Sequence, residues 1–98
     1  MYYRRDYQRY ILNDSASLIT NEGREKDFLL KDLSARGVGI VGNSPLNINE
    51  DVKVIINAPL FFDRPVSKAA KVVWCQKIDE NLWQVGLDFG EEEKIKIF

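Results

Sequence analysis

The sequence contains no histidine and a single cysteine, Cys75, among its 98 residues. One cysteine cannot form an intramolecular disulfide, which excludes a small secreted scaffold held together by disulfides. Without histidine, the chain lacks zinc sites of the usual mixed type and every histidine-based catalytic triad. No pair of carboxylates is singled out by its spacing. The sequence therefore argues against an enzyme and indicates neither a metal nor a cofactor.

Long apolar stretches are also missing, since no run approaches the roughly 20 residues that span a bilayer. The N-terminus is basic and aromatic, unlike a signal peptide. Only three prolines and six glycines occur, while 45% of the residues are hydrophobic, a composition typical of a folded core rather than of disorder. We therefore expect one soluble, cytoplasmic domain over residues 1–98, without membrane insertion.

Excess charge is absent as well, because fourteen basic and fifteen acidic residues give a net charge of −1. A chain of this charge has no general attraction to a nucleic acid polymer. Its charges are nevertheless unevenly placed: Arg4, Arg5 and Arg9 fall within the first nine residues, and residues 91–93 are all glutamate. This distribution favours a local anion site at the N-terminus.

Short segments with strand character, separated by turn signals, make up most of the chain. The patterns favour strands at residues 15–20, 25–33, 37–41, 51–57, 66–78 and 82–89. Six or seven strands at spacings of about ten residues, without a convincing amphipathic helix, predict an all-β antiparallel barrel or sandwich. Residues 1–10 are interpreted as a ligand-binding loop, 11–90 as the barrel and 91–98 as a tail, either helical or extended.

A first motif, Arg5-x-x-x-Arg9, is preceded directly by Arg4. Planar guanidinium groups can hold phosphate oxygens with two hydrogen bonds, stack on bases, or bond the O6/N7 edge of guanine. The spacing alone is a weak signal, because six arginines produce it in about one shuffled sequence in three or four. It gains weight only in combination with a second motif further along the chain.

The second motif, Asp32-x-Ser34-x-x-Gly37, stands at the entrance to an apolar strand. An extended backbone would place the aspartate and the serine on one face. The carboxylate can accept hydrogen bonds from the N1–H and amino edge of guanine, and the hydroxyl can bond a phosphate or ring atom. The glycine permits a positive φ or a close backbone approach. Arginines and one carboxylate together predict a site for a guanine nucleotide.

In this order, the two motifs resemble the signature of the PilZ domain family, bacterial receptors for cyclic di-GMP. The resemblance continues beyond them. Val38-Gly39-Ile40 follows the glycine as an apolar strand, Val72-Val73-Trp74 is similar to a late strand of the family, and residues 85–89 are similar to its closing Val-Gly-x-x-Phe strand. The similarity therefore covers almost the whole chain.

This resemblance implies a six-stranded antiparallel β-barrel of the split type, with the N-terminal arginine loop folded over its outer face. It also implies that the arginines bind the guanine bases and phosphates. The aspartate would accept hydrogen bonds from a guanine edge, and the serine would bond the ligand. The glycine, which has no side chain, would keep the wall of the pocket low. The residues so assigned to cyclic di-GMP are Arg4, Arg5, Arg9, Asp32, Ser34 and Gly37. The family binds either one ligand or an intercalated pair of ligands per domain, and the sequence leaves both open, with the extra arginine compatible with the pair.

Two further features bear on the site. Arg36 stands where small or apolar residues are frequent in the family, and it either contacts the ligand or points outward. Trp74, Trp83 and Phe89 lie in apolar strand settings. We therefore expect these aromatic residues in the core rather than at the ligand.

The function implied by the resemblance is that of a non-catalytic sensor. Cyclic di-GMP would order the arginine loop and present a changed surface to a neighbouring domain or to a protein partner in a motility, pilus or exopolysaccharide system. An alternative is an interaction module of the same fold without nucleotide affinity. A third reading, a binder of single-stranded nucleic acid with a similar small barrel, conflicts with the net charge and with the gathering of three of the six arginines in one loop.

Overall fold

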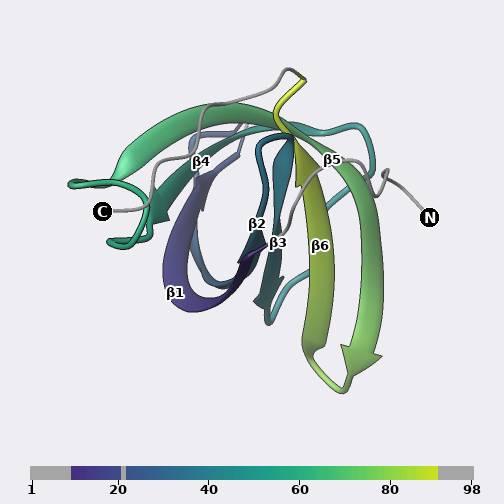
Figure 1. Cartoon of the computed structure of the whole chain (residues 1–98). Coiled ribbons are helices and arrows are strands. Elements are labelled where there is room, and N and C mark those ends of the chain that lie inside the picture. The colour runs from purple at the N-terminus through teal and green to yellow at the C-terminus, as the bar shows by residue number, and fades with distance from the viewer. Residues whose placement is uncertain (1–9, 21, 91–98) are drawn as a thin grey trace.

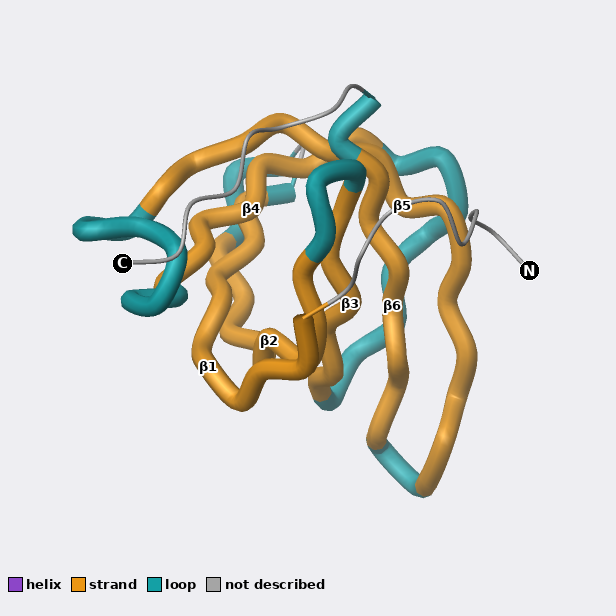
Figure 2. Tube along the Cα trace, in the orientation of Figure 1, coloured by secondary structure: helices purple, strands orange, loops and turns teal. Residues whose placement is uncertain are grey.

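Strands alone form the regular structure of the part of the chain that this computed structural model describes, residues 10–20 and 22–90. They are β1 (Tyr10–Ile19), β2 (Glu25–Leu33), β3 (Gly37–Gly42), β4 (Asp51–Asn57), β5 (Val66–Asp79) and β6 (Leu82–Asp88). Every neighbouring pair is antiparallel, and the order β1-β2-β3-β6-β5-β4 closes into a barrel through β1 and β4 (Figures 1 and 2). The described residues include no helix long and apolar enough to cross a membrane.

The expectation of an antiparallel all-β barrel is confirmed, and the strands fall close to the segments expected for them. The largest difference is β1, which begins at Tyr10 rather than at residue 15. Its pairing with β2 is irregular between Ile11 and Asp14. Such an irregularity breaks the period-two pattern by which a strand is recognised in a sequence.

The core lies inside the barrel, where alternate residues of each strand meet. On β4, for example, Val52, Val54 and Ile56 are buried and the residues between them are more exposed. Full burial of one such side chain stabilises the fold by about 1.5–3 kcal/mol. The remaining buried hydrophobic residues are Ala16, Leu18, Phe28, Leu30, Leu33, Val38, Ile40, Leu46, Ala58, Phe61, Ala70, Val72, Val85 and Leu87.

The longest strand, β5, has two successive neighbours. Its first half pairs with β4 up to Lys71, and from Lys71 onward it pairs with β6. In Figure 1 it arches over the barrel and descends into the hairpin with β6. The fold thus sets β2, β3, β6 and β5 side by side, and the candidate site lies on the outer face of these four strands.

Two β-bulges decide which side chains reach that face. The register shifts between Leu30 and Asp32 on β2, and between Val72 and Trp74 on β5. Strict alternation from the buried Leu30 and Val72 would place the aspartate and the tryptophan inside the barrel. One extra residue in each strand reverses the alternation. Both side chains consequently lie outside.

Candidate functional site

A single row of residues crosses the four neighbouring strands. Asp32 on β2 is opposite Gly39 on β3, which is opposite Gly86 on β6, which in turn is opposite Trp74 on β5. The row therefore has a carboxylate at one end, an indole at the other and two glycines between them. Because residues paired across antiparallel strands have Cα atoms about 4.5–5.5 Å apart, these four residues lie close together.

The row belongs to the outer face of the barrel. The residues on either side of Gly39 are fully buried in the core, as are those on either side of Gly86. Since side chains alternate between the two faces of a strand, both glycines face outward. They form a strip of backbone without side chains of its own, and both are buried because side chains of the neighbouring strands cover them.

The two end residues lean over this strip. The carboxylate oxygens of Asp32 lie 2.7 and 2.8 Å from the position that a Cβ atom of Gly39 would occupy. The indole atoms Cε2 and Cδ1 of Trp74 lie 2.6 and 2.7 Å from the corresponding position at Gly86. A hydrogen-bond acceptor and an aromatic ring are therefore held over adjacent glycines. Such a pair can recognise the edge and the face of a base.

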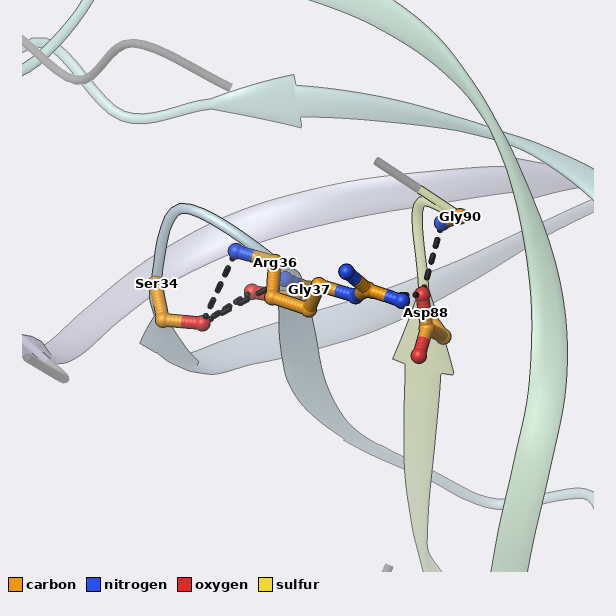
Figure 3. Close-up of polar contacts among 5 residues, drawn as sticks. All are labelled: Ser34, Arg36, Gly37, Asp88 and Gly90. Carbon is orange, nitrogen blue, oxygen red and sulfur yellow. Dashed lines mark hydrogen bonds and ion pairs between the residues drawn. The ribbon is translucent and has the colours of Figure 1, made fainter. Parts of the chain in front are cut away.

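The second motif forms the turn between β2 and β3. Ser34 is fully buried, and its N–H donates to the carbonyl oxygen of Gly37 at 2.9 Å. Its hydroxyl accepts from the N–H groups of Arg36 and Gly37, both at 3.3 Å, and donates to the Gly37 carbonyl at 3.4 Å (Figure 3). The serine thus closes the turn by bonding the backbone around it.

The expectation that Asp32 and Ser34 lie on one face assumed an extended backbone through both residues, but the strand does not reach Ser34. Leu33 and Ser34 are both fully buried although they are consecutive. Alternation ends with β2 at Leu33, and the next residue already belongs to the turn. The turn, rather than the strand period, determines where the hydroxyl lies.

Two reasons were expected for a glycine at position 37, a positive φ or a close backbone approach, and the structure supports the second. Among the described glycines, positive φ values occur at Gly23 and Gly90, and not at Gly37. A Cβ atom at position 37 would instead overlap the carbonyl oxygen of Leu87 on β6. A close backbone approach is therefore the reason for this glycine, and the backbone approached is that of the neighbouring strand.

Arg36 points away from the turn along the outer surface toward Asp88 at the end of β6 (Figure 3). Its Nε lies 3.5 Å from Asp88 Oδ1, and its side chain is 41% exposed. The same carboxylate oxygen accepts the N–H of Gly90 at 2.6 Å, and the N–H of Phe89 donates to the Arg36 carbonyl at 2.8 Å. Two contacts thus join the turn to the end of β6, and the third holds Asp88 within that end.

Arg4, Arg5 and Arg9 lie outside the described residues. The residues that follow them are the first of β1. Tyr10 pairs with Leu33 and Ile11 pairs with Asp32, both on β2. The first motif therefore ends one residue before a strand that enters the barrel directly beside the second motif. The topology thus sets Tyr10, the residue that follows the first motif, opposite Leu33 of the second motif.

The expectation that all three late aromatic residues lie in the core is not met. Trp74 is on the outer face, and Phe89 packs against the core while remaining partly exposed. Trp83 is also partly exposed, with Lys77 Nζ 5.5 Å from its ring centroid. Trp74 is the site residue that the sequence analysis missed. Glycines inside strands, such as Gly86, are the available signal, since they often mark a close approach.

Metal binding has no support in the described part of the chain, where no group of three or more His, Cys, Asp or Glu side chains gathers. The charged and hydroxyl groups described at the site are the carboxylates of Asp32 and Asp88, the hydroxyl of Ser34 and the guanidinium of Arg36. Such groups suit an organic ligand with hydrogen-bond donors and negative charge.

Solved structures with this fold are known. The Bacillus subtilis inhibitor of motility, MotI/DgrA, superposes with a TM-score of 0.69 at 21% identity, over 92% of this chain and 44% of that one. Borreliella burgdorferi PlzA in complex with c-di-GMP gives a TM-score of 0.65 at 16% identity, over 93% and 36%. The K. pneumonia MrkH–c-di-GMP complex gives 0.61 at 17% identity, over 89% and 44%.

The present chain therefore spans less than half the length of each of these proteins. No curated protein sequence matches it. The family model of the PilZ domain, in contrast, matches residues 3–97, nearly the full sequence. Together with the closed six-stranded barrel, this match shows that the chain belongs to the PilZ domain family.

Proposed function

We propose that this domain is a receptor for cyclic di-GMP. The observation that carries the proposal is the row formed by Asp32, Gly39, Gly86 and Trp74, which lies beside the point where the arginine-bearing segment joins the barrel. Family membership and the c-di-GMP complexes of PlzA and MrkH support the same ligand.

In the proposed complex, one guanine lies on the outer face beside the Asp32 carboxylate and the Trp74 indole, which cover the two glycines. Asp32 accepts hydrogen bonds from the guanine N1–H and amino groups, and Trp74 contacts the face of the base. Arg5 and Arg9 bind the phosphates and stack on the bases, with Arg4 assisting them. The site thereby supplies donors for the anionic part of the ligand and an acceptor for the edge of guanine.

Ser34 and Gly37 contribute mainly through the shape of the turn. The serine hydroxyl already bonds the backbone of Arg36 and Gly37, and the glycine allows β3 to approach β6. We propose that both residues hold the turn beside Asp32 in the form that accepts the ligand. Any direct contact of the serine with the ligand would add to this role.

The proposed output is a change of surface rather than a chemical reaction. Ligand phosphates would offset the mutual repulsion of the N-terminal arginines and so favour closure of their segment onto the barrel. The closed surface would then be available to a neighbouring domain or a protein partner. Similarity to an inhibitor of motility supports a motility component as one such partner.

Isothermal titration of cyclic di-GMP into the purified domain tests the proposal. We expect saturable binding that is abolished by Arg9→Ala and strongly weakened by Asp32→Ala. Arg64→Ala is the matched control, because Arg64 forms an exposed ion pair with Asp63 in another loop. A stoichiometry of two would indicate the intercalated dimer of ligands.

Absence of heat with the folded wild-type domain would contradict the proposal. It would favour the alternative function, an interaction module of the same fold without nucleotide affinity. Binding that survives Asp32→Ala unchanged would retain the ligand but reject the row across β2, β3, β6 and β5 as its site.

A further inference from the structure

Arg36 is a cation of the second motif that the family signature does not assign. It lies in the turn, between Ser34 and Gly37, and its side chain extends to Asp88. Asp88 follows Gly86 by two residues on β6, so both face outward from the barrel. Two residues along a strand span about 7 Å. The guanidinium of Arg36 therefore lies on the same face as the proposed base site and close to it.

The ion pair between Arg36 and Asp88 is weak. Their separation of 3.5 Å exceeds the roughly 2.7–2.9 Å typical of strong charge-assisted hydrogen bonds. With its side chain 41% exposed, the arginine remains accessible to water, which screens its attraction to the carboxylate. Exchange of this partner for another anion consequently requires little free energy.

Asp88, in contrast, has a second partner that keeps it in place. Its Oδ1 accepts the N–H of Gly90 at 2.6 Å, and Gly90 has a φ of +86°. This short bond closes the turn in which the chain leaves β6. The carboxylate can lose the arginine and still be held by the backbone, so the arginine is the mobile member of the pair.

We propose that Arg36 is an additional phosphate-binding residue, held by Asp88 in the free protein and transferred to a ligand phosphate on binding. The inference rests on the proposed function, since it concerns the same nucleotide. A phosphate accepts two parallel hydrogen bonds from a guanidinium, an arrangement stronger than the existing contact with Asp88. The carboxylate therefore competes with the ligand for one cation.

This competition predicts effects of opposite sign for the two members of the pair. Arg36→Ala removes the phosphate contact and should weaken binding of cyclic di-GMP by about tenfold. Asp88→Asn releases the arginine, and its amide oxygen can still accept the N–H of Gly90. Binding to this variant should be about threefold tighter or more, because the competing carboxylate is gone.

The double variant Arg36→Ala/Asp88→Asn separates this mechanism from a general effect of charge. If Asp88 acts through Arg36, the double variant should bind like Arg36→Ala alone. Asp63→Asn is the matched control, because Asp63 is an exposed carboxylate that pairs with an arginine, Arg64, at 3.8 Å in another loop. Its affinity should stay within about twofold of the wild type.

The measurements are titration calorimetry of all five proteins with cyclic di-GMP and an NMR spectrum of the arginine Nε–H signals. We expect the Arg36 Nε–H signal to shift on binding in the wild type. Weaker binding in both single variants would overturn the inference, since it would show that the ion pair supports the turn. A gain from Asp88→Asn that persists without Arg36 would also overturn it. Absence of binding by the wild type would instead reject the proposed function itself.

Discussion

The carboxylate of Asp32 lies over Gly39, with its two oxygens 2.7 and 2.8 Å from the place where a Cβ atom of residue 39 would stand. A glycine on β3 thus provides the space that an aspartate on β2 occupies. Because the glycine faces outward between two buried residues, the carboxylate is held at the surface without entering the core. The position of the proposed guanine acceptor therefore depends on a residue of the adjacent strand.

Replacement of Gly39 by alanine should test this dependence. The new methyl group would displace the carboxylate, and we expect the affinity for cyclic di-GMP to fall by about tenfold. The free energy of unfolding should change by less than about 1 kcal/mol, because the end of the Asp32 side chain can rotate away and the unfolded chain loses some freedom. Calorimetry and urea unfolding measure the two quantities.

The same substitution in an Asp32→Ala background is the control for Gly39→Ala. Any affinity that remains in Asp32→Ala should not fall further when alanine is added at position 39, because the carboxylate is already absent. Full wild-type affinity in Gly39→Ala would show that the position of the carboxylate over the strip is not needed for binding.

The two tryptophans offer a spectroscopic prediction. Trp74 lies over Gly86 in the proposed site, whereas Trp83 is on the β5–β6 hairpin near Lys77. In Trp83→Phe the remaining indole is that of Trp74, and we expect cyclic di-GMP to change its fluorescence because a base contacts the ring. In Trp74→Phe the remaining Trp83 should respond little. Equal responses of the two variants at saturating ligand would contradict the placement of the base.

The hydroxyl of Ser34 should contribute to stability through the turn. Ser34→Ala removes the acceptor of two backbone N–H groups, of which that of Gly37 is buried. Leaving a buried donor without a partner costs about 1–3 kcal/mol, and we expect a loss of that size in urea unfolding. Ser67→Ala, at an exposed position of β5, should change stability by less than about 0.5 kcal/mol. A loss no larger than that of the control would show that the hydroxyl bonds are replaceable.

Much of the fold could be predicted because it depends on repeated local patterns. The alternation of Val52, Val54 and Ile56 identifies β4 with its correct bounds, and turn residues separate the other strands. Asp32 and Gly37 were recognisable from their motif. The arginines of the first motif remain predicted ligand residues, since Arg4, Arg5 and Arg9 lie outside the described part of the chain.

The misplaced residues have a common physical cause, the relation between one strand and its neighbour. A bulge adds one residue without a compositional signal, so the outward position of Trp74 could not be read from its own strand. The pairing of Gly39 with Gly86 likewise depends on register, which a single strand does not contain.

Gly37→Ala should damage the fold far more than Gly39→Ala. A Cβ atom would overlap the Leu87 carbonyl oxygen, which belongs to the backbone of β6 and cannot rotate away. Relief requires β3 and β6 to separate, and we expect a loss of about 3 kcal/mol in the free energy of urea unfolding. Gly23 is the informative comparison, because it has open space around it but a φ of +79°. Asparagine tolerates that conformation, so Gly23→Asn should cost less than about 1 kcal/mol whereas Gly37→Asn should be as damaging as alanine. Comparable small losses at both positions would show that the two strands are not held at the distance seen in the structure.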